Sequence, residues 1–456
     1  MSPWQAIQSL AKQSFSTYYI SMGKGKGQGG CGATMELDLS LPKGIVPLEQ
    51  ALPGITAAVS DIADALKAGQ KVAVFCDYDP DGTCGAAIMS LALDKFKQQT
   101  IFGFASAADG TGLSEQFVRD ADSQGASTLI TVDLGSSQPA VLDLARSLGI
   151  KVIVTDHHAP HPEADPDHHL NPQLHGPSQS SGAVVAWKLA LALEEQLYGA
   201  PRPKVLSEGA FLAAFGARAD MMDIKETENA AIDSMGGQAA PPGLQALAER
   251  LSVKSLSASN QSKLAALLNL PKRSALAKAS DAALILSASS KSQATSAIDR
   301  LLAVREACSE ASRCFGSQAA QQMSDQSSSR VASAVIDLPD CHLYAGYAGI
   351  VAMRMSGAAA RPAVIFVPLD QQSSRYKYSV RWTGKRENLG DGLLESIDAL
   401  GKIASRSGGS PPGGHPQAMG GICGSGEIEE VKSALEDWAK GRGLQELDFQ
   451  STKETK

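Results

Sequence analysis

The chain has 456 residues, with 41 Lys or Arg against 48 Asp or Glu, so its formal net charge is −7. This length predicts two or three domains. No apolar run of about 18 residues is present, which argues against a membrane span. The first residues lack the basic and apolar regions of a secretory signal peptide, so we expect a cytoplasmic protein. The acidic balance argues, at first, against nucleic-acid binding.

The seven cysteines include no Cys-X-X-Cys pair, which argues against a disulfide framework and against a structural zinc site. Near the N-terminus, glycine alternates with lysine and glutamine over residues 23–30. This composition favours a flexible loop over a phosphate-binding loop, because it matches neither nucleotide-binding fingerprint. We therefore treat the first segment as a leader.

Changes in composition and hydrophobic pattern along the chain predict five segments. They are a flexible leader (1–45), an α/β domain (46–230), a helical connector (231–335), a smaller α/β domain (336–447) and a frayed tail (448–456). The connector is rich in Ala, Ser, Gln and Leu, and we find no convincing strand in it. In the smaller domain, strand-like runs occur at 363–367 and 377–381.

Within the first α/β domain, short apolar runs predict buried parallel strands. They lie at 71–76, 128–132 and 151–155. Helical patterns separate and follow them, at 86–96, 114–123, 139–148 and 182–197. This alternation predicts a doubly wound parallel sheet.

Acidic residues follow each of these predicted strands. The first strand runs into Asp77-Tyr-Asp79-Pro-Asp81-Gly82-Thr83, the second ends at Asp133, and the third ends at Asp156-His157-His158. Ligands bind at this carboxyl edge in open α/β sheets. Each Asp alone could be a helix cap or a turn residue. Three consecutive strand ends with two histidines indicate a functional site instead.

The kinds of side chain present point to the metal. Carboxylates with one or two imidazoles and no thiolate suit Mn²⁺ or Mg²⁺ better than zinc. The number of carboxylates suggests two ions, an arrangement used to hydrolyse phosphoesters. Cys76 and Cys84 fit small core residues better than ligands. The later histidines fit a solvated loop better than an extra metal site; they are His161, His168, His169 and His175.

These segments resemble motifs I to III of the DHH phosphoesterase superfamily, at 77–83, 131–135 and 154–160. The segment 212–220, Leu-Ala-Ala-Phe-Gly-Ala-Arg-Ala-Asp, resembles motif IV, and Gly413-Gly-His-Pro-Gln-Ala-Met-Gly420 resembles the DHHA1 domain. Within the superfamily the similarity is greatest to the RecJ family of single-strand-specific 5′→3′ exonucleases. Further matching segments are 112–115, 170–172, 181–189 and 349–352.

The resemblance implies a role for each matching residue. Asp79, with Asp77 beside it, would belong to one metal site. Asp81, His157 and Asp220 would hold the other metal, Asp133 would bridge the two, and His158 would contact the scissile phosphate. His415 in its Gly413-Gly414 loop would grip a phosphate of the bound strand, Arg381 would assist it, and Ser181 with Gly182 would help to hold the strand.

The sequence departs from the family pattern in several places. Residues 104–109 lack the usual arginine, Leu134 replaces a small or polar residue, and Cys341-His342 stands where Trp-His is usual. The chain ends 41 residues after His415 of Gly-Gly-His, so we expect the C-terminal oligonucleotide-binding barrel of many RecJ proteins to be absent. None of these departures removes a metal ligand.

A basic stretch at 375–386 offers a place for nucleic acid despite the net charge. It carries five Lys or Arg, no acidic residue, and Tyr376, Tyr378 and Trp382 between them. Cations with interleaved aromatic rings are typical of single-strand binding. The alternative is an exposed strand that basic residues keep soluble. Because the motif around His415 occurs in the same domain, we favour nucleic-acid binding by this stretch.

We therefore expect a two-metal exonuclease that releases mononucleotides from single-stranded DNA in the 5′→3′ direction, in DNA repair or recombination. A single-strand-binding protein or a helicase is a candidate partner, and no membrane is involved. One alternative is a DHH phosphodiesterase acting on short RNA, cyclic dinucleotides or nucleoside bisphosphates. A second is a nucleic-acid-binding scaffold without catalysis.

Overall fold

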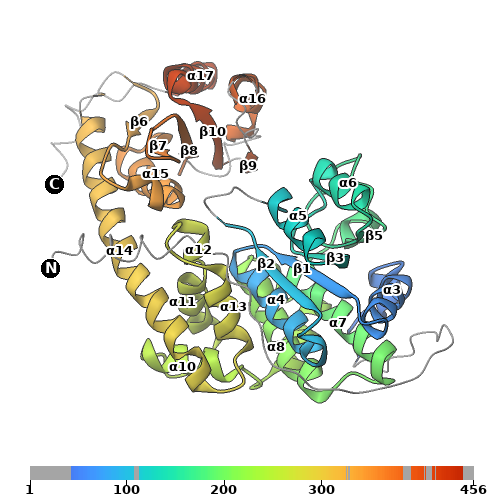
Figure 1. The fold of residues 1–456 in the computed structure, drawn as a ribbon. Helices are drawn as coiled ribbons and strands as arrows, with labels where there is room; N and C mark the ends of the chain where they lie inside the picture. The colour runs from blue at the N-terminus through green and yellow to red at the C-terminus, as the bar shows by residue number, and fades with distance from the viewer. Residues whose placement is uncertain are drawn as a thin grey trace. The chain divides into compact units, whose positions relative to one another are not determined.

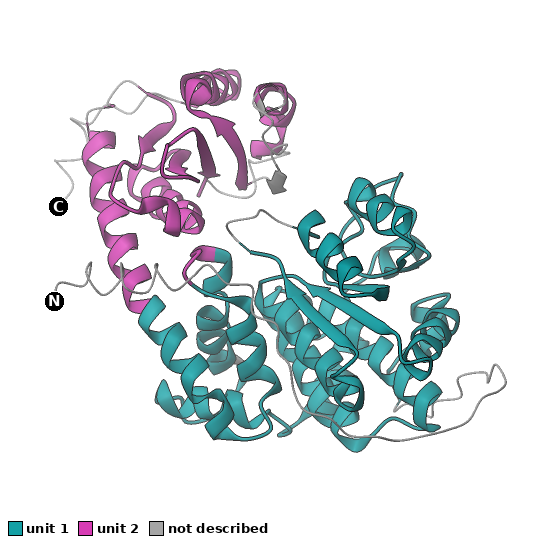
Figure 2. Cartoon of the chain, viewed as in Figure 1, with its two compact units in different colours: residues 1–272, 277–304 teal, residues 273–276, 305–456 magenta. Residues whose placement is uncertain are grey.

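The computed structural model describes residues 43–106, 112–324, 326, 329–383, 392–404, 406, 413–415 and 417–444. The chain divides into two compact units (Figure 2). Unit 1 comprises residues 1–272 and 277–304, and unit 2 comprises residues 273–276 and 305–456. The predicted tail, and the predicted leader apart from residues 43–45, lie outside the described residues. The five-segment division itself stays a prediction.

Unit 1 is built on a five-stranded parallel sheet (Figure 1). Its strands are β1 (Lys71–Cys76), β2 (Thr100–Phe104), β3 (Ala126–Val132), β4 (Lys151–Thr155) and β5 (His168–Leu170). The order β2-β1-β3-β4-β5 is that of a doubly wound sheet, so the predicted fold class is confirmed. The edge strands β2 and β5 are not signalled by an apolar run, because β2 is only half buried and β5 has three residues.

Strand β5 corrects the interpretation as a solvated loop for two of the later histidines, His168 and His169, while His161 and His175 are exposed outside the sheet. His168 and His169 pair with Ile153 and Val154 of β4. The His168 ring contacts Asp61, and the His169 ring contacts the hydroxyl of Ser136 at 2.8 Å. Paired backbone and partnered rings therefore place both residues in the sheet.

Helices cover both faces of this sheet, as Figure 1 shows. One face carries α3 (Ile55–Lys67), α4 (Pro80–Ala92) and α7 (Gly182–Tyr198), and the other carries α5 (Glu115–Ser123) and α6 (Pro139–Ser147). Because both faces are covered, strands such as β1 are buried nearly end to end. Helix α4 begins six residues before the predicted start, at Pro80, since Asp79 caps it and proline is favoured in the first turn.

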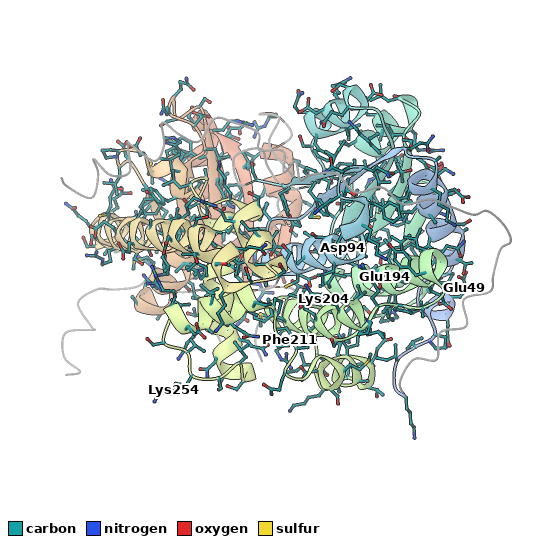
Figure 3. The ribbon with its side chains drawn as sticks, turned by 60° about the horizontal axis from the view of Figure 1, so that its bottom comes forward. Glu49, Asp94, Glu194, Lys204, Phe211 and Lys254 are labelled. Carbon is teal, nitrogen blue, oxygen red and sulfur yellow. The ribbon has the colours of Figure 1, made fainter. Side chains whose placement is uncertain are left out.

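Helix α8 (Pro203–Ala219) packs on α4 and α7 and is fixed by a partly buried charge cluster at its start. Arg202 Nε donates to Glu194 Oε1 at 2.7 Å, and its Nη1 donates to Asp94 Oδ1 at 2.8 Å. Figure 3 labels these two carboxylates, which come from α7 and from the turn after α4. This contact ties together the three helices that carry residues of the candidate site.

Short helices follow in the predicted connector. They are α9 (Thr227–Gly236), α10 (Pro242–Arg250), α11 (Ala258–Leu268), α12 (Leu270–Arg273) and α13 (Ala279–Ser287), followed by the long α14 (Lys291–Ser324). One strand, β6 (Ala332–Val335), lies at the end of this range. The expectation of no strand in 231–335 is therefore wrong at its last few residues, where only four residues signal the strand.

Unit 2 holds a second, mixed sheet of β6, β7 (Ala363–Pro368), β8 (Arg375–Arg381), β9 (Gly413–His415) and β10 (Ala418–Gly424). The order is β6-β7-β8-β10-β9, with only the β6–β7 pair parallel. Helix α15 (Ala348–Ala359) covers one face, and α16 (Ile397–Ala404) with α17 (Ile428–Gly441) covers the other (Figure 1). The smaller α/β domain is thus confirmed as a fold.

Among the described residues, no helix combines the length and the apolar character that crossing a membrane requires.

One ion-pair cluster ties α3 to β4 and β5 and yields a pH-dependent prediction. Asp61 Oδ2 lies 2.7 Å from Lys151 Nζ and 2.7 Å from His168 Nε2. Burial acts to raise the Asp61 pKa, but the hydrogen bonds and charges of Lys151 and His168 outweigh it and lower the pKa. The folded state therefore favours the charged carboxylate.

Asp61→Asn should lower the free energy of unfolding by about 1 kcal/mol near neutral pH, a modest value because the cluster is partly solvated. A lowered pKa contributes stability above the unfolded-state value of about 3.9, and this contribution is lost as the pH falls through the folded-state pKa. Urea unfolding of both proteins from about pH 7 to about pH 3 measures this, with Asp64→Asn on the exposed face of α3 as the control. A difference that stays constant down to the lowest pH would contradict the assignment.

Candidate metal centre

The candidate site lies where the connections of the parallel sheet reverse direction. Strand β1 lies between β2 and β3, so the chain moves to one side after β1 and to the other side after β2. The crevice at the carboxyl ends of such strands is the usual ligand site of a doubly wound sheet. Asp77 follows β1 and Asp133 follows β3 at this point.

Asp79 caps helix α4 and is held by contacts to both of its carboxylate oxygens. Its Oδ1 accepts hydrogen bonds from the backbone N–H groups of Asp81 at 3.0 Å and Gly82 at 3.2 Å. Its Oδ2 accepts a hydrogen bond from Lys272 Nζ at 3.1 Å. A β-carbon at Gly82 would lie 2.7 Å from the Asp77 carbonyl oxygen, so the turn requires glycine.

Asp81 is buried against the N-terminus of α7. Its Oδ1 accepts from Ser181 Oγ at 2.8 Å and from the Ala183 N–H at 3.2 Å, while its Oδ2 accepts from the Gly182 N–H at 2.7 Å. The partial positive charge of a helix N-terminus favours a carboxylate there. Ser181 and Gly182 were predicted to hold the substrate strand, but both are buried and their polar groups contact Asp81. Substrate contact by this pair stays a prediction.

Asp133 occupies a strained backbone position. Its φ of 63° lies in the left-handed region, which costs a non-glycine residue free energy and is found preferentially at functional sites. A β-carbon at Gly182 would lie 2.4 Å from Asp133 Oδ1, so α7 can approach the carboxylate only because that residue is glycine. The fold therefore places Asp133 at the centre of the site.

The Nε2 nitrogen of the His157 ring faces the carboxylates of the site. This nitrogen lies 3.2 Å from Asp133 Oδ1, 3.5 Å from Asp220 Oδ2 and 3.9 Å from Asp81 Oδ2. Both His157 Nε2 and Asp133 Oδ1 are buried and have no hydrogen-bond partner among the described residues. Unpaired buried polar atoms are costly unless another species satisfies them. Two such atoms 3.2 Å apart fit a shared cation.

His158 is held as a cation by Asp156. The ring Nδ1 lies 2.8 Å from Asp156 Oδ1, and the same oxygen accepts from the N–H groups of His157 and His158. The hydrogen bond to Asp156 raises the His158 pKa to about 9. Burial acts to raise the Asp156 pKa, but the His158 contacts lower it to about 2. A charged, half-exposed imidazole thus stands beside the carboxylates.

The pKa values of four other carboxylates are raised, in contrast to the lowered pKa of Asp156. Burial, and then the charge of Asp79, raises the pKa of Asp77 to about 7, that of Asp81 to about 8 and that of Asp220 to about 6. Burial, and then the charge of Asp81, raises the pKa of Asp133 well above its usual value. Burial, and then the His158 charge, lowers the pKa of His157 to about 4. Full ionisation of this group of carboxylates therefore requires added positive charge.

Three groups of side chains bring possible ligand atoms within 4.8 Å of one another. They are Asp77 with Asp79 and Asp133, Asp81 with His157 and Asp220, and Asp133 with His157 and His158. The structure thus brings together all seven residues predicted to be catalytic, including His158, which was expected to contact the scissile phosphate. The first two groups match the two predicted metal sites, and Asp133 belongs to two groups. The donors are oxygen and imidazole nitrogen without thiolate, which fits Mn²⁺ or Mg²⁺.

The substrate residues predicted in unit 2 lie on and beside its sheet. Residues alternate along β8, so Tyr376, Tyr378 and Trp382 face the core with α16 and α17, while Arg381 faces α15. Tyr378 is buried, and Trp382 packs edge-on against Trp438. The buried ring of Tyr378 therefore cannot stack on a base, whereas base contacts by the partly buried Tyr376 and Trp382 stay predictions.

Arg381 is half buried and contacts backbone atoms. Its Nη1 donates to the carbonyl oxygens of Val380 at 2.8 Å and Met419 at 3.2 Å, and burial lowers its pKa. Gly413, Gly414 and His415 form β9 beside β10, which pairs with β8. Substrate contacts by Arg381, Trp382 and His415 stay predictions, and residues 384–391 lie outside the described residues.

Two site residues were not assigned from the sequence. Asp156 belongs to a predicted acidic cluster, yet its role in holding His158 becomes visible only in the structure. Lys272 lies in the predicted connector and reaches Asp79 from 193 residues along the chain. Nothing in the local pattern around Lys272 signals this contact.

The comparisons with known proteins agree with this geometry. Residues 71–216 match the family model described as "DHH family, N-terminal domain". The chain is 30% identical over 417 residues to the single-stranded-DNA-specific exonuclease RecJ of Bacillus subtilis (strain 168). That alignment covers 87% of this chain and 49% of the relative, so the chain spans about half the length of the relative that it matches.

Two solved structures have a similar fold. One is exonuclease RecJ bound to manganese, with a TM-score of 0.69, 24% identity and coverage of 87% of this chain and 96% of that chain. The other is RecJ from Thermus thermophilus in complex with Mg²⁺, with a TM-score of 0.61, 22% identity and coverage of 89% and 55%. Family model, relative and fold agree with the motifs at the strand ends. Residues 71–216 of the chain therefore form an N-terminal domain of the DHH family.

Proposed function

We propose that this chain is a metal-dependent exonuclease that hydrolyses the phosphodiester bonds of single-stranded DNA from the 5′ end and releases mononucleotides. One observation supports metal-dependent hydrolysis most directly. Two buried acceptor atoms, Asp133 Oδ1 and His157 Nε2, lie 3.2 Å apart without a hydrogen-bond partner among the described residues. They lie at the edge of the sheet where ligands bind.

The residues fit two ions. Asp81, His157 and Asp220 would hold one divalent cation, and Asp77 with Asp79 would hold the other. Asp133 would bridge them, since it shares a candidate group with Asp77 and Asp79 and its Oδ1 lies 3.2 Å from His157 Nε2 of the other group. Two bound divalent cations activate a water molecule and stabilise the charge that develops on the leaving oxygen of a phosphoester.

The protein groups supply binding and orientation. His158 is a half-exposed cation beside Asp133, with its Nδ1 4.0 Å from Asp133 Oδ1, so it can donate a hydrogen bond to a phosphate oxygen there. Asp156 fixes the ring through a 2.8 Å contact. Ser181 and Gly182 keep the Asp81 carboxylate oriented. This preorganised charge would favour the transition state.

The identity of the substrate rests on the relatives. The Bacillus subtilis relative bears the name of a single-stranded-DNA-specific exonuclease, and we transfer this specificity and the 5′→3′ polarity to the chain as a proposal. Arg381 and His415 of unit 2 would contact backbone phosphates. A single-strand-binding protein or a helicase would be a partner, and the protein would act in the cytoplasm in DNA repair or recombination.

One observation favours a second candidate function. Because the rings of Tyr376, Tyr378 and Trp382 pack toward the core, β8 offers less base stacking than a long single strand would use. A phosphodiesterase for short oligoribonucleotides or dinucleotides needs less of this surface.

A digestion series separates the candidates. The full chain with Mn²⁺ is incubated with 5′-labelled and 3′-labelled long DNA strands, with the same strands blocked at either end, with RNA, and with dinucleotides. The exonuclease should degrade long DNA, stop at a 5′ block and become inactive in EDTA. Cleavage of dinucleotides alone would establish the second candidate instead.

Asp133→Asn should abolish hydrolysis while leaving the fold and strand binding largely intact. The amide keeps the size of the side chain but removes the negative charge that both ions would share. We expect activity to fall by at least about a hundredfold, together with weaker Mn²⁺ binding in calorimetry. Asp143→Asn on the exposed face of α6 is the matched control. Wild-type activity in Asp133→Asn would refute the metal assignment.

Asp156→Asn tests the positioning of His158. The change weakens the hydrogen bonds that orient the ring but alters no residue of the predicted metal core. We expect kcat to fall by about 10- to 100-fold, the usual effect of losing an orienting partner. Mn²⁺ affinity should change less than in Asp133→Asn. Equal losses of metal affinity in the two variants would show that Asp156 acts on the metal instead.

A further inference from the structure

Asp79 has one oxygen available to a metal ion, and that oxygen already has a cation beside it. Its Oδ1 is engaged by two backbone N–H groups as the cap of α4, at 3.0 and 3.2 Å. Its Oδ2 accepts a hydrogen bond from Lys272 Nζ at 3.1 Å. A divalent ion in the group of Asp77, Asp79 and Asp133 would therefore share Oδ2 with the ammonium or displace it.

The ammonium is held on two sides. Lys272 lies in the short helix α12, directly after the buried residues Leu270 and Pro271, which fix the backbone from which it reaches Asp79. Its Nζ also lies 6.0 Å from the ring centroid of Tyr78, a buried residue between Asp77 and Asp79. A cation over an aromatic face is favoured there. Half of the Lys272 side chain remains exposed, so the ammonium can leave into solvent.

In the other metal group, no Lys or Arg among the described residues forms an ion pair with Asp81 or Asp220, although the charges of His158 and Lys272 act on Asp220 from farther away. Asp81 accepts hydrogen bonds from the neutral Ser181 hydroxyl and from two backbone N–H groups. His158 is the charged neighbour of Asp133, but its Nδ1 is 4.0 Å from that carboxylate and 2.8 Å from Asp156. The two groups that would hold the ions therefore differ in direct contact with an ammonium, which among their described carboxylates Asp79 alone makes.

We propose that Lys272 is a positioning residue that competes with one divalent ion for Asp79 Oδ2 and so makes the two metal sites unequal. The group of Asp81, His157 and Asp220 fills first. The group of Asp77, Asp79 and Asp133 binds its ion more weakly, because the ammonium must move aside. When that ion leaves, Lys272 returns and neutralises part of the buried charge. This inference rests on the metal sites of the proposed function.

Calorimetric titration of the metal-free full chain with Mn²⁺ tests the proposal. The wild type should show two classes of site, and Lys272→Met should tighten the weaker class by about tenfold, since removing one charge next to a divalent ion relieves a direct repulsion. The gain in Tm on adding Mn²⁺ should also be larger in the variant. Lys272→Arg should restore the wild-type isotherm, and Lys263→Met on the exposed face of α11 should leave it unchanged.

Lys272→Gln keeps a hydrogen-bond donor near Asp79 and replaces the methionine variant if that variant does not fold. A weaker class that is unchanged in both neutral variants would overturn the inference. So would loss of that class, which would mean that Lys272 supports the ion and does not compete with it. A wild type that binds no Mn²⁺ would instead overturn the metal sites of the proposed function. The two failures are therefore distinguishable.

Discussion

The mutual repulsion of buried carboxylates is the constraint on which the site depends. Asp81 and Asp133 are almost fully buried, and Asp77, Asp79 and Asp220 lie close enough to shift their pKa values. Proteins rarely bury several carboxylates together, because taking each charged carboxylate out of water costs several kcal/mol unless it is paired. The raised pKa values show that the protein alone does not supply enough positive charge. The site is thus built for cations that come from solution.

The fold stabilises two of these carboxylates with the backbone dipoles of helix N-termini. The N-terminus of α4 binds Asp79, and the N-terminus of α7 binds Asp81, so each helix begins on a carboxylate. Gly182 and Gly216 let α7 and α8 approach Asp133 and Asp81 to distances that a β-carbon would forbid. The same packing leaves Asp133 Oδ1 and His157 Nε2 without donors among the residues that the structure describes. The close approach of these helices therefore accounts both for the dense packing and for the unsatisfied candidate ligand atoms.

The sequence predicts much of unit 1, because short apolar strands followed by acidic residues leave few topologies open. The seven predicted catalytic residues come from that pattern and from a family resemblance, and the structure brings them together. Contacts between distant segments could not be predicted. Nothing in the local sequence indicates that Lys272 contacts Asp79 or that Ser181 donates to Asp81. The composition of β8 suggested that its rings bind bases, but the two-residue period of a strand turns Tyr378 into the core.

The net charge of −7 no longer argues against a nucleic-acid substrate. Five of the acidic residues belong to the metal core, namely Asp77, Asp79, Asp81, Asp133 and Asp220. Two divalent ions would bring the formal charge from −7 to −3, because −7 + 4 = −3. The added charge would sit at the position where a scissile phosphate would bind, and local charge of this kind matters more to an anionic ligand than the overall balance. Because the formal charge would still be negative, affinity would have to come from a few specific phosphate contacts and from the ions themselves.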